Sequence, residues 1–295
     1  MRRILTSLVG ALALLAATIT PSHAITGNYV ADDEHPFVGL VAFYDENGEF
    51  AGRCSGSLLS PSVFLTAGHC TDGAATAVVW FQQDAGADYD PETGAPASSG
   101  YPDGCAQGTL GIMCATSDEL YNWGFDDFAT FPDTKDLGLV ILDQPITVSE
   151  YGQLAEAGTL DPLATARGGQ DLTVTASGYG LSYSSPVAVE SFRSRLMAEG
   201  KIVNLESQNN AGFNVQTVGK GKGRGGTCSG DSGGPIFLGG YESNLIVAVT
   251  SFGLNSYCRG VDFAYRVDTV AAQQWILDTV AASSAADEAE LIVIV

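Results

Sequence analysis

The stretch "GTCSGDSGGP", residues 226–235, places one serine, Ser232, among several glycines. A serine hydroxyl is a poor nucleophile until a neighbouring base removes its proton, and acyl transfer also needs hydrogen-bond donors that hold the oxyanion. Glycines let a backbone turn sharply, so that successive N–H groups point into one concavity. We therefore predict that Ser232 is a nucleophile and that the N–H groups of Gly230 and Ser232 are oxyanion donors. Taken alone, this pattern is equally typical of an ordinary loop.

A nucleophilic serine needs a base, and the sequence offers few candidates. Beyond residue 24 the only histidines are His35 and His69. The motif "LTAGHC" (65–70) puts His69 at the end of an apolar run and beside a cysteine, whereas His35 precedes a proline in a polar stretch. We predict that His69 is the base.

An imidazole that gains a proton is stabilised by a carboxylate. In "TKDLGLVIL" (134–142), Asp136 stands immediately before a strongly apolar run. A carboxylate at this position is expected to be half-buried, and a buried charge needs a partner such as a histidine N–H. Asp133 and Asp143 are alternatives, both close to prolines in expected turns.

The first residues have the pattern of an export signal. Two arginines open the chain, an apolar run covers residues 4–19, and small residues stand at Ser22 and Ala24. The apolar run is shorter than the ~20 residues of a comfortable membrane span. We expect residues 1–24 to be a cleaved signal peptide, which leaves residues 25–295 as a secreted protein. An uncleaved membrane anchor is the alternative.

The chain is strongly acidic. It has 295 residues, 34 acidic and 13 basic ones, and a formal net charge of −21. Such a surface repels polyanions, so neither nucleic acid nor an anionic membrane is an expected partner.

Six cysteines follow the expected signal peptide, at positions 54, 70, 105, 114, 228 and 258. An even number in an exported protein indicates three disulfides, although spacing alone does not select the pairs. A zinc site is the other interpretation, and the absence of any C-x-x-C pattern disfavours it.

The rest of the chain has the pattern of a β protein. Runs rich in Val, Phe, Leu and Thr, separated by Gly, Pro, Asp or Ser, predict strands at 37–44, 56–60, 63–67, 76–82, 137–142, 171–180, 213–218, 235–238 and 245–253. Helical spacing occurs only in "TVAAQQWILDTVAA" (269–282), for which Asp268 is the expected N-cap. This pattern predicts an all-β barrel or sandwich with one C-terminal helix.

Two segments interrupt the strand pattern. Residues 84–105 are acidic and rich in Gly and Pro, which is typical of a surface loop. Four of its acidic residues suit a calcium ion as well as a solvated loop: Asp84, Asp88, Asp90 and Glu92. Residues 284–295 are acidic and then apolar, and we expect disorder or a terminal strand there.

Taken together, the serine, histidine and aspartate motifs resemble the trypsin/chymotrypsin family of secreted serine endopeptidases. "TAGHC", "DLGLV" and "GDSGGP" occur in the order of the family, and "SGYG" (177–180) and "SFG" (251–253) resemble two further family segments. The resemblance implies two antiparallel six-stranded β-barrels with the active site between them. It assigns residues 25–283 to this domain. It implies protein or peptide substrates, a monomer, and neither a metal nor an organic cofactor.

The resemblance also implies specific pairs of residues. The disulfides would be Cys54–Cys70 and Cys228–Cys258, which leaves Cys105–Cys114. The new ammonium group at Ile25 would pair with Asp231 after cleavage, so that removing the signal peptide also completes the active site.

Six residues would surround the side chain that precedes the cleaved bond: Gly226, Thr227, Ser251, Phe252, Gly253 and Asp262. Gly226 stands where the trypsin branch has an aspartate, while Asp262 offers a carboxylate from the opposite wall. Both Lys/Arg and large apolar side chains remain candidates. Two other function classes are a catalytically silent homologue that binds partners and a secreted esterase.

Overall fold

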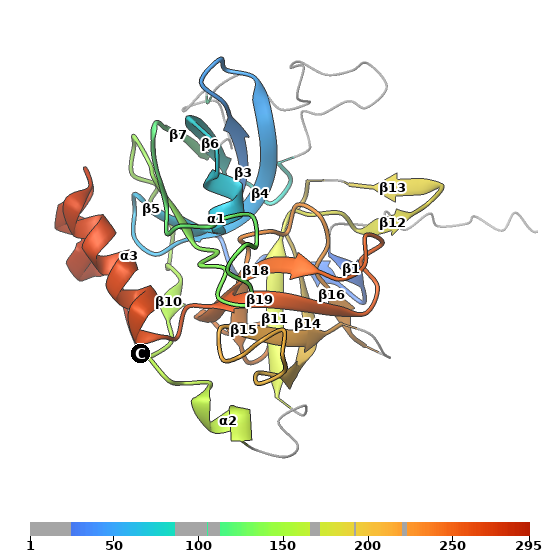
Figure 1. Cartoon of the computed structure of the whole chain (residues 1–295). Coiled ribbons are helices and arrows are strands. Elements are labelled where there is room, and N and C mark those ends of the chain that lie inside the picture. Colours follow the sequence, from blue (N-terminus) through green and yellow to red (C-terminus); the bar gives the residue numbers. More distant parts are fainter. Residues whose placement is uncertain (1–24, 86–104, 106–112, 166–171, 192, 220–222) are drawn as a thin grey trace, which may run out of the picture.

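The computed structural model describes residues 25–85, 105, 113–165, 172–191, 193–219 and 223–295. Two β-sheets lie side by side, with the N-terminal half of the chain forming one and the C-terminal half the other (Figure 1). The helix α3 (Val270–Ala282) lies at the outer side of the molecule.

The first sheet contains seven strands in the order β7-β6-β3-β4-β5-β9-β8. Their bounds are β3 (Val38–Tyr44), β4 (Phe50–Leu58), β5 (Val63–Thr66), β6 (Thr76–Trp80), β7 (Cys114–Ser117), β8 (Glu119–Asn122) and β9 (Gly138–Ile141). Only Asp118 separates β7 from β8, so these two form one bent strand. This strand pairs with β6 at one end and β9 at the other, which closes an antiparallel barrel of six strands.

The second sheet closes in the same way. Its barrel strands are β11 (Thr173–Gly178), β14 (Leu196–Asn204), β15 (Asn214–Val218), β17 (Pro235–Leu238), β18 (Leu245–Gly253) and β19 (Val261–Arg266). The pairing of β18 with β19 joins the two ends of the series β18-β17-β11-β14-β15-β19. The prediction of two antiparallel six-stranded barrels is therefore confirmed.

Short strands attach to this second barrel or lie beside it. β2 (Val30–Ala31) pairs with β14, and β10 (Gln153–Leu154) runs parallel to β18. β1 (Thr26–Gly27) pairs with β16 (Gly225–Gly226). β12 (Tyr183–Ser185) and β13 (Ala188–Glu190) form a hairpin that projects away from the barrels (Figure 1).

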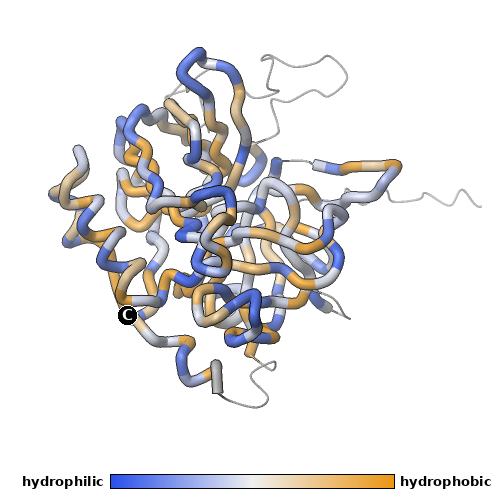
Figure 2. Tube along the Cα trace, viewed as in Figure 1, coloured by the Kyte–Doolittle hydropathy of each residue, from blue (hydrophilic) through white to orange (hydrophobic). Residues whose placement is uncertain are grey.

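One apolar core fills the first barrel and extends to residues of β17, β18 and β19, a second core lies within the second barrel, and hydrophobic stretches follow the strands (Figure 2). Phe64 and Trp80 are among the largest buried side chains of the first core, and Val215 and Val247 are fully buried in the second. Burying one such side chain contributes about 1.5–3 kcal/mol, so the alternation of inward and outward residues fixes the register of the strands.

The C-terminal helix begins one residue later than predicted. Thr269 is its N-cap and accepts a hydrogen bond from Ala272 N, whereas Asp268 is fully buried and binds Arg266. The other helices are α1 (Gly68–Thr71), α2 (Asp161–Thr165) and the 3₁₀ helix η2 (Ala286–Leu291). Within the described residues, no helix has the length and apolar character needed to cross a membrane.

The C-terminal residues pack against the connection between the barrels. Leu154 N donates to Val293 O at 2.9 Å, and Val295 N donates back to Leu154 O at 3.0 Å. Glu288 accepts hydrogen bonds from Ser60 Oγ and Ser62 N. Both expectations for this tail are wrong: residues 286–291 form the ordered helix η2, and Ile294 makes only an isolated parallel bridge with Leu154.

The structure forms the two disulfides that the resemblance implies, Cys54–Cys70 and Cys228–Cys258, and the remaining pair, Cys105–Cys114. Cys54 and Cys70 lie close to His69 but are joined to each other, so this group has no free thiolate for zinc. Of the proposed calcium ligands, Asp88, Asp90 and Glu92 lie outside the described residues.

A buried polar cluster connects the N-terminal segment to the second barrel. His35 Nδ1 lies 2.8 Å from Asp32 Oδ1, and the Ser177 hydroxyl donates to the same carboxylate. Arg195 Nε donates to the Asp32 carbonyl at 2.9 Å. Burial opposes the charge of Asp32, but the contacts with His35, Ser177 and Arg195 outweigh it, and the pKa of Asp32 lies below its ordinary value. His35, expected in a polar stretch, is in fact fully buried.

Replacing Asp32 by Asn should lower the free energy of unfolding by about 3 kcal/mol at pH 7, because it breaks a buried, hydrogen-bonded pair. A carboxylate with a lowered folded pKa stabilises the protein above its unfolded pKa, near 4, and this contribution is lost as the pH falls through the folded value. The gap between wild type and Asp32→Asn in urea denaturation should therefore shrink below about pH 4. Asp33→Asn, at an exposed neighbouring position, is the control. Equal losses in both variants would contradict the role of the cluster.

Candidate active site

His69 and Asp136 meet at the edge of the first barrel. Asp136 Oδ1 accepts a hydrogen bond from His69 N at 2.7 Å, and Asp136 Oδ2 lies 2.9 Å from His69 Nδ1. The Asp136 side chain is fully buried, while the His69 side chain is 25% exposed. Asp136 therefore fixes the imidazole through Nδ1 and leaves Nε2 free to act on a bound molecule.

A serine from the second barrel completes the surroundings of this carboxylate. The Ser251 hydroxyl, on β18, donates to Asp136 Oδ2. Sequence reasoning placed Ser251 only in the wall of the substrate pocket, and the link to Asp136 has no local sequence signal because 115 residues separate the two.

Ser232 lies on a tight turn that packs against the residues just before His69. Ser55 N donates to Ser232 O at 2.8 Å. Gly233 has a φ of +76°, and a Cβ there would stand 2.1 Å from Thr66 Oγ1. Only glycine allows this approach, which brings the turn to the histidine segment. Among the described residues, no hydrogen bond joins the Ser232 hydroxyl to His69.

The backbone beside Ser232 is held by a buried carboxylate. Asp231 is fully buried and accepts hydrogen bonds from Gly180 N at 2.8 Å and Cys228 N at 2.9 Å. Burial raises the pKa of Asp231 to about 7, against the lowering effect of these two bonds and of the Arg53 charge. A Cβ on Gly180 would stand 2.5 Å from the Asp231 carboxylate, so glycine is required at that position too.

The segment that begins at Ile25 lies against the strand leading to this turn. The Ile25 side chain is fully buried in the second core. Thr26 pairs with Gly226, and Asn28 N donates to Arg224 O at 3.0 Å. Residues 1–24 are outside the described part of the chain.

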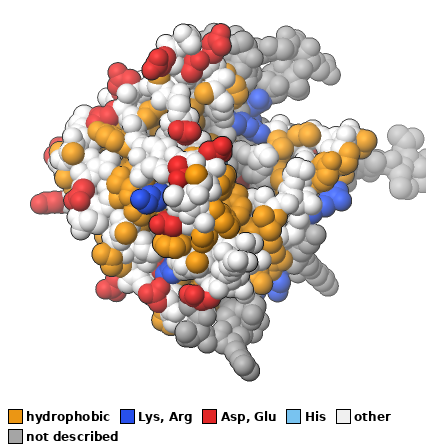
Figure 3. All heavy atoms as spheres, in the orientation of Figure 1, with side chains coloured by type: hydrophobic (Ala, Val, Ile, Leu, Met, Phe, Trp, Pro, Cys, Tyr) orange, Lys and Arg blue, Asp and Glu red, His pale blue; other side chains and the backbone are white. Residues whose placement is uncertain are grey.

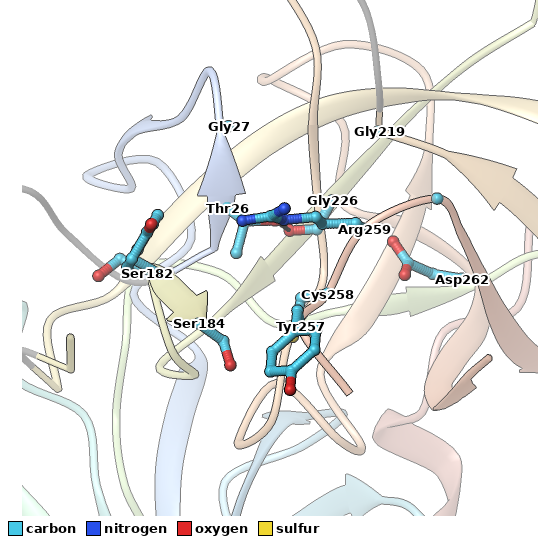
Figure 4. A pocket seen from close by; sticks show the side chains of 12 residues that line it. Thr26, Gly27, Ser182, Ser184, Gly219, Gly226, Tyr257, Cys258, Arg259 and Asp262 are labelled. Carbon is cyan, nitrogen blue, oxygen red and sulfur yellow. Dashed lines mark hydrogen bonds between the residues drawn. The ribbon is translucent and has the colours of Figure 1, made fainter. Parts of the chain in front are cut away.

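Two cavities of about 210 Å³ each share Cys258 and Asp262, and one of them is also lined by Ser232. The first, which we call the substrate cavity, is lined by Thr227, Cys228, Ser229, Ser232, Thr250, Ser251, Phe252, Gly253, Asn255, Ser256, Cys258 and Asp262. The second, the rear cavity, is lined by Gly226 together with Thr26, Gly27 and the residues around Tyr257 (Figure 4). Five of the six predicted pocket residues thus line the substrate cavity, and Gly226 lines the rear one.

Asp262 is the carboxylate between these cavities. In Figure 4 its side chain points from β19 toward Gly226. Its Oδ2 accepts a hydrogen bond from Thr227 N at 3.0 Å. Burial raises the pKa of Asp262 to about 6.

Aromatic side chains form a wall next to the histidine. Phe252 stacks on Phe263 with ring centroids 4.6 Å apart, and Phe128 and Phe131 meet Phe252 edge-on at 5.5 and 5.7 Å. Phe125 lies 5.8 Å from the His69 ring. Sequence reasoning identified only Phe252, although the three-residue spacing in "FDDFATF" (125–131) is a usable signal.

The geometry can be compared with known proteins. A family model described as Trypsin matches residues 24–102 and 116–276. The chain belongs to the trypsin family. This assignment confirms the resemblance found in the sequence motifs.

Three curated relatives agree with it. The chain is 27% identical over 227 residues to CLIP domain-containing serine protease B10 of Anopheles gambiae, covering 72% of this chain and 58% of the relative. It is 28% identical over 275 residues to Serine protease 7 of Drosophila melanogaster, covering 86% and 64%. Brachyurin of Leptuca pugilator is 29% identical over 210 residues, covering 70% and 77%. The chain thus spans about three-fifths of the length of the first two relatives.

Solved structures share the fold. HL collagenase superimposes with a TM-score of 0.60 at 18% identity, covering 86% of this chain and 97% of that one. Human heparin binding protein gives a TM-score of 0.57 at 22% identity, covering 85% and 94%.

Proposed function

We propose that this protein is a secreted serine endopeptidase that hydrolyses peptide bonds through Ser232, His69 and Asp136. The observation that carries the proposal is the buried Asp136 carboxylate holding His69 Nδ1, next to the glycine turn of Ser232. The names of the first two relatives, both serine proteases, support it. The first 24 residues and the three disulfides support export.

The reaction follows from the positions of these groups. His69 Nε2 takes the proton of the Ser232 hydroxyl while the serine oxygen attacks the peptide carbonyl carbon. Asp136 keeps Nδ1 protonated and stabilises the imidazolium, and the N–H groups of Gly230 and Ser232 bind the oxyanion. The imidazolium then gives its proton to the leaving amine. Water attacks the acyl-enzyme in the same way and restores Ser232.

Removal of residues 1–24 would supply a cation to the oxyanion turn. In the uncleaved chain the Ile25 nitrogen is an amide. Cleavage makes it an ammonium at the start of a segment already paired with Gly226, one residue before Thr227. Asp231 has a raised pKa and only backbone hydrogen bonds among the described residues, so a charged partner stabilises its ionised form. We therefore retain the Ile25–Asp231 pair as the activation step.

The substrate cavity favours a basic side chain before the cleaved bond. Asp262 is the carboxylate among its lining residues, and Gly253 and Thr227 are small. A half-buried carboxylate attracts Lys or Arg more strongly than an exposed one, because the local dielectric is lower. HL collagenase and human heparin binding protein share only the fold with this chain, so their ligands are not carried over to it.

Ser232→Ala should abolish labelling by a fluorophosphonate probe and reduce kcat/KM for peptides by at least about 10³-fold, since no other group forms the acyl-enzyme. Ser149→Ala, at an exposed position, should keep both the labelling and the peptide cleavage of the wild type. Labelling is followed by gel fluorescence, and cleavage by mass spectrometry of a peptide library. Peptide cleavage by Ser232→Ala would refute the role of Ser232 as the nucleophile. Ester hydrolysis without peptide cleavage by the wild-type protein would favour the esterase.

A chain that begins one alanine before Ile25 should lose most peptidase activity and keep its fold, because its ammonium is displaced from Asp231. The protein beginning at Ile25 and its Ile25→Val variant, which have the correct length, should remain active. Peptide cleavage and circular dichroism of the three proteins provide the measurement. Full activity in the extended chain would rule out the coupling.

Preference for arginine over citrulline before the cleaved bond should rise as the pH increases through about 6, where Asp262 becomes charged. The protonation state of His69 affects the cleavage of both substrates equally, so it cancels in the ratio of their kcat/KM values. Asp262→Asn should bring the ratio of the two kcat/KM values close to one at all pH values. A ratio that stays high in Asp262→Asn, or a stronger preference for Phe or Leu in wild type, would show that the acidic pocket is wrong.

A further inference from the structure

Arg53 lies over the turn that binds the oxyanion in the proposed function. It is on β4, immediately before Cys54, whose disulfide partner Cys70 follows His69. A Cβ on Gly230 would stand 3.2 Å from Arg53 Nε and 3.3 Å from its Cζ. The guanidinium is therefore within a side chain's reach of the reacting carbonyl.

Most N–H donors of this guanidinium have no acceptor among the described residues. Its one hydrogen bond to the described residues runs from Nη1 to Tyr179 O at 3.5 Å, the limit of such a bond. No carboxylate of the described residues lies within 4 Å of it, although the chain has 34 acidic residues. By contrast, Arg266 binds two carboxylates. The charge of Arg53 acts on the buried Asp231, but among the described residues no hydrogen bond or ion pair joins the two side chains.

The position of Arg53 selects one side of the substrate. The substrate cavity, which takes the side chain before the cleaved bond, does not include Arg53 in its lining. Arg53 instead precedes Cys54, whose disulfide partner Cys70 follows His69. In the proposed reaction His69 gives its proton to the leaving amine, so Arg53 lies on the side of the residues that follow the cleaved bond. Figure 3 shows basic side chains in the hollow between the first barrel and the projecting hairpin, and scattered acidic and other basic side chains over the rest of this face.

We propose that Arg53 is a specificity residue that binds an acidic side chain of the substrate within the first two residues after the cleaved bond. An arginine presents a planar fork of donors that matches a carboxylate in a bidentate pair, and this pair is stronger than a neutral hydrogen bond. The inference rests on the proposed peptidase activity and adds the side of the substrate that follows the cut.

The test uses matched peptides with Glu or Gln at the first or the second position after the cleaved bond, all with arginine before it. Wild type should cleave the best Glu peptide with a kcat/KM about fivefold higher than its Gln counterpart, and added salt should reduce this ratio. Arg53→Gln should bring the ratio to about one, and Arg53→Lys should restore part of it. Arg259→Gln, which removes another arginine at an exposed position, should leave the ratio unchanged.

The outcomes separate the two proposals. Equal cleavage of Glu and Gln peptides by wild type overturns the role of Arg53 alone. The same conclusion follows if Arg53→Gln slows both peptides by the same factor, since Arg53 then supports only the turn. If a protein that begins at Ile25 cleaves neither these peptides nor any member of the peptide library, both this inference and the proposed function are overturned.

Discussion

The buried carboxylate of Asp231 is the constraint on which the seam between the two barrels depends. Removing a carboxylate from water is costly unless donors replace the lost hydration. Here Gly180 and Cys228 supply N–H groups, and both Gly178 and Gly180 must lack a Cβ because one would stand 2.5 Å from the carboxylate. These contacts fix the backbone next to Ser232 and thereby the direction of the proposed oxyanion donors.

The seam holds carboxylates in three different environments. Asp136 receives N–H groups from His69 and a hydroxyl from Ser251, so its charge is well compensated. Asp231 and Asp262 have fewer partners for their degree of burial, and the pKa of each is raised. A nearby cation stabilises the ionised form of such a buried carboxylate. In our proposals this cation is the ammonium of Ile25 at Asp231 and a basic side chain of the substrate at Asp262.

The local sequence predicted the strands whose residues are apolar on their own, such as those at 37–44 and 245–253. It did not predict β14 (Leu196–Asn204), because a glutamate, a glycine and a lysine interrupt its apolar pattern. Those residues form a strand since β11 and β15 pair with it on both sides. Helix α3 shows the same limit: Asp268 is a good cap by residue type, but the buried Arg266 binds it, and Thr269 caps instead.

The sequence by itself determined the fold class and the family, and it led to the proposed roles of Ser232, His69 and Asp136, because those residues stand in short motifs whose chemistry is local. Only the tertiary structure decided which groups far apart in the chain meet. Ser251 donates to Asp136 across 115 positions, Ser177 donates to Asp32 across 145 positions, and Arg53 lies over Gly230. Such contacts arise from the closure of the two barrels, and a contact between residues far apart in the chain leaves no periodic trace in it.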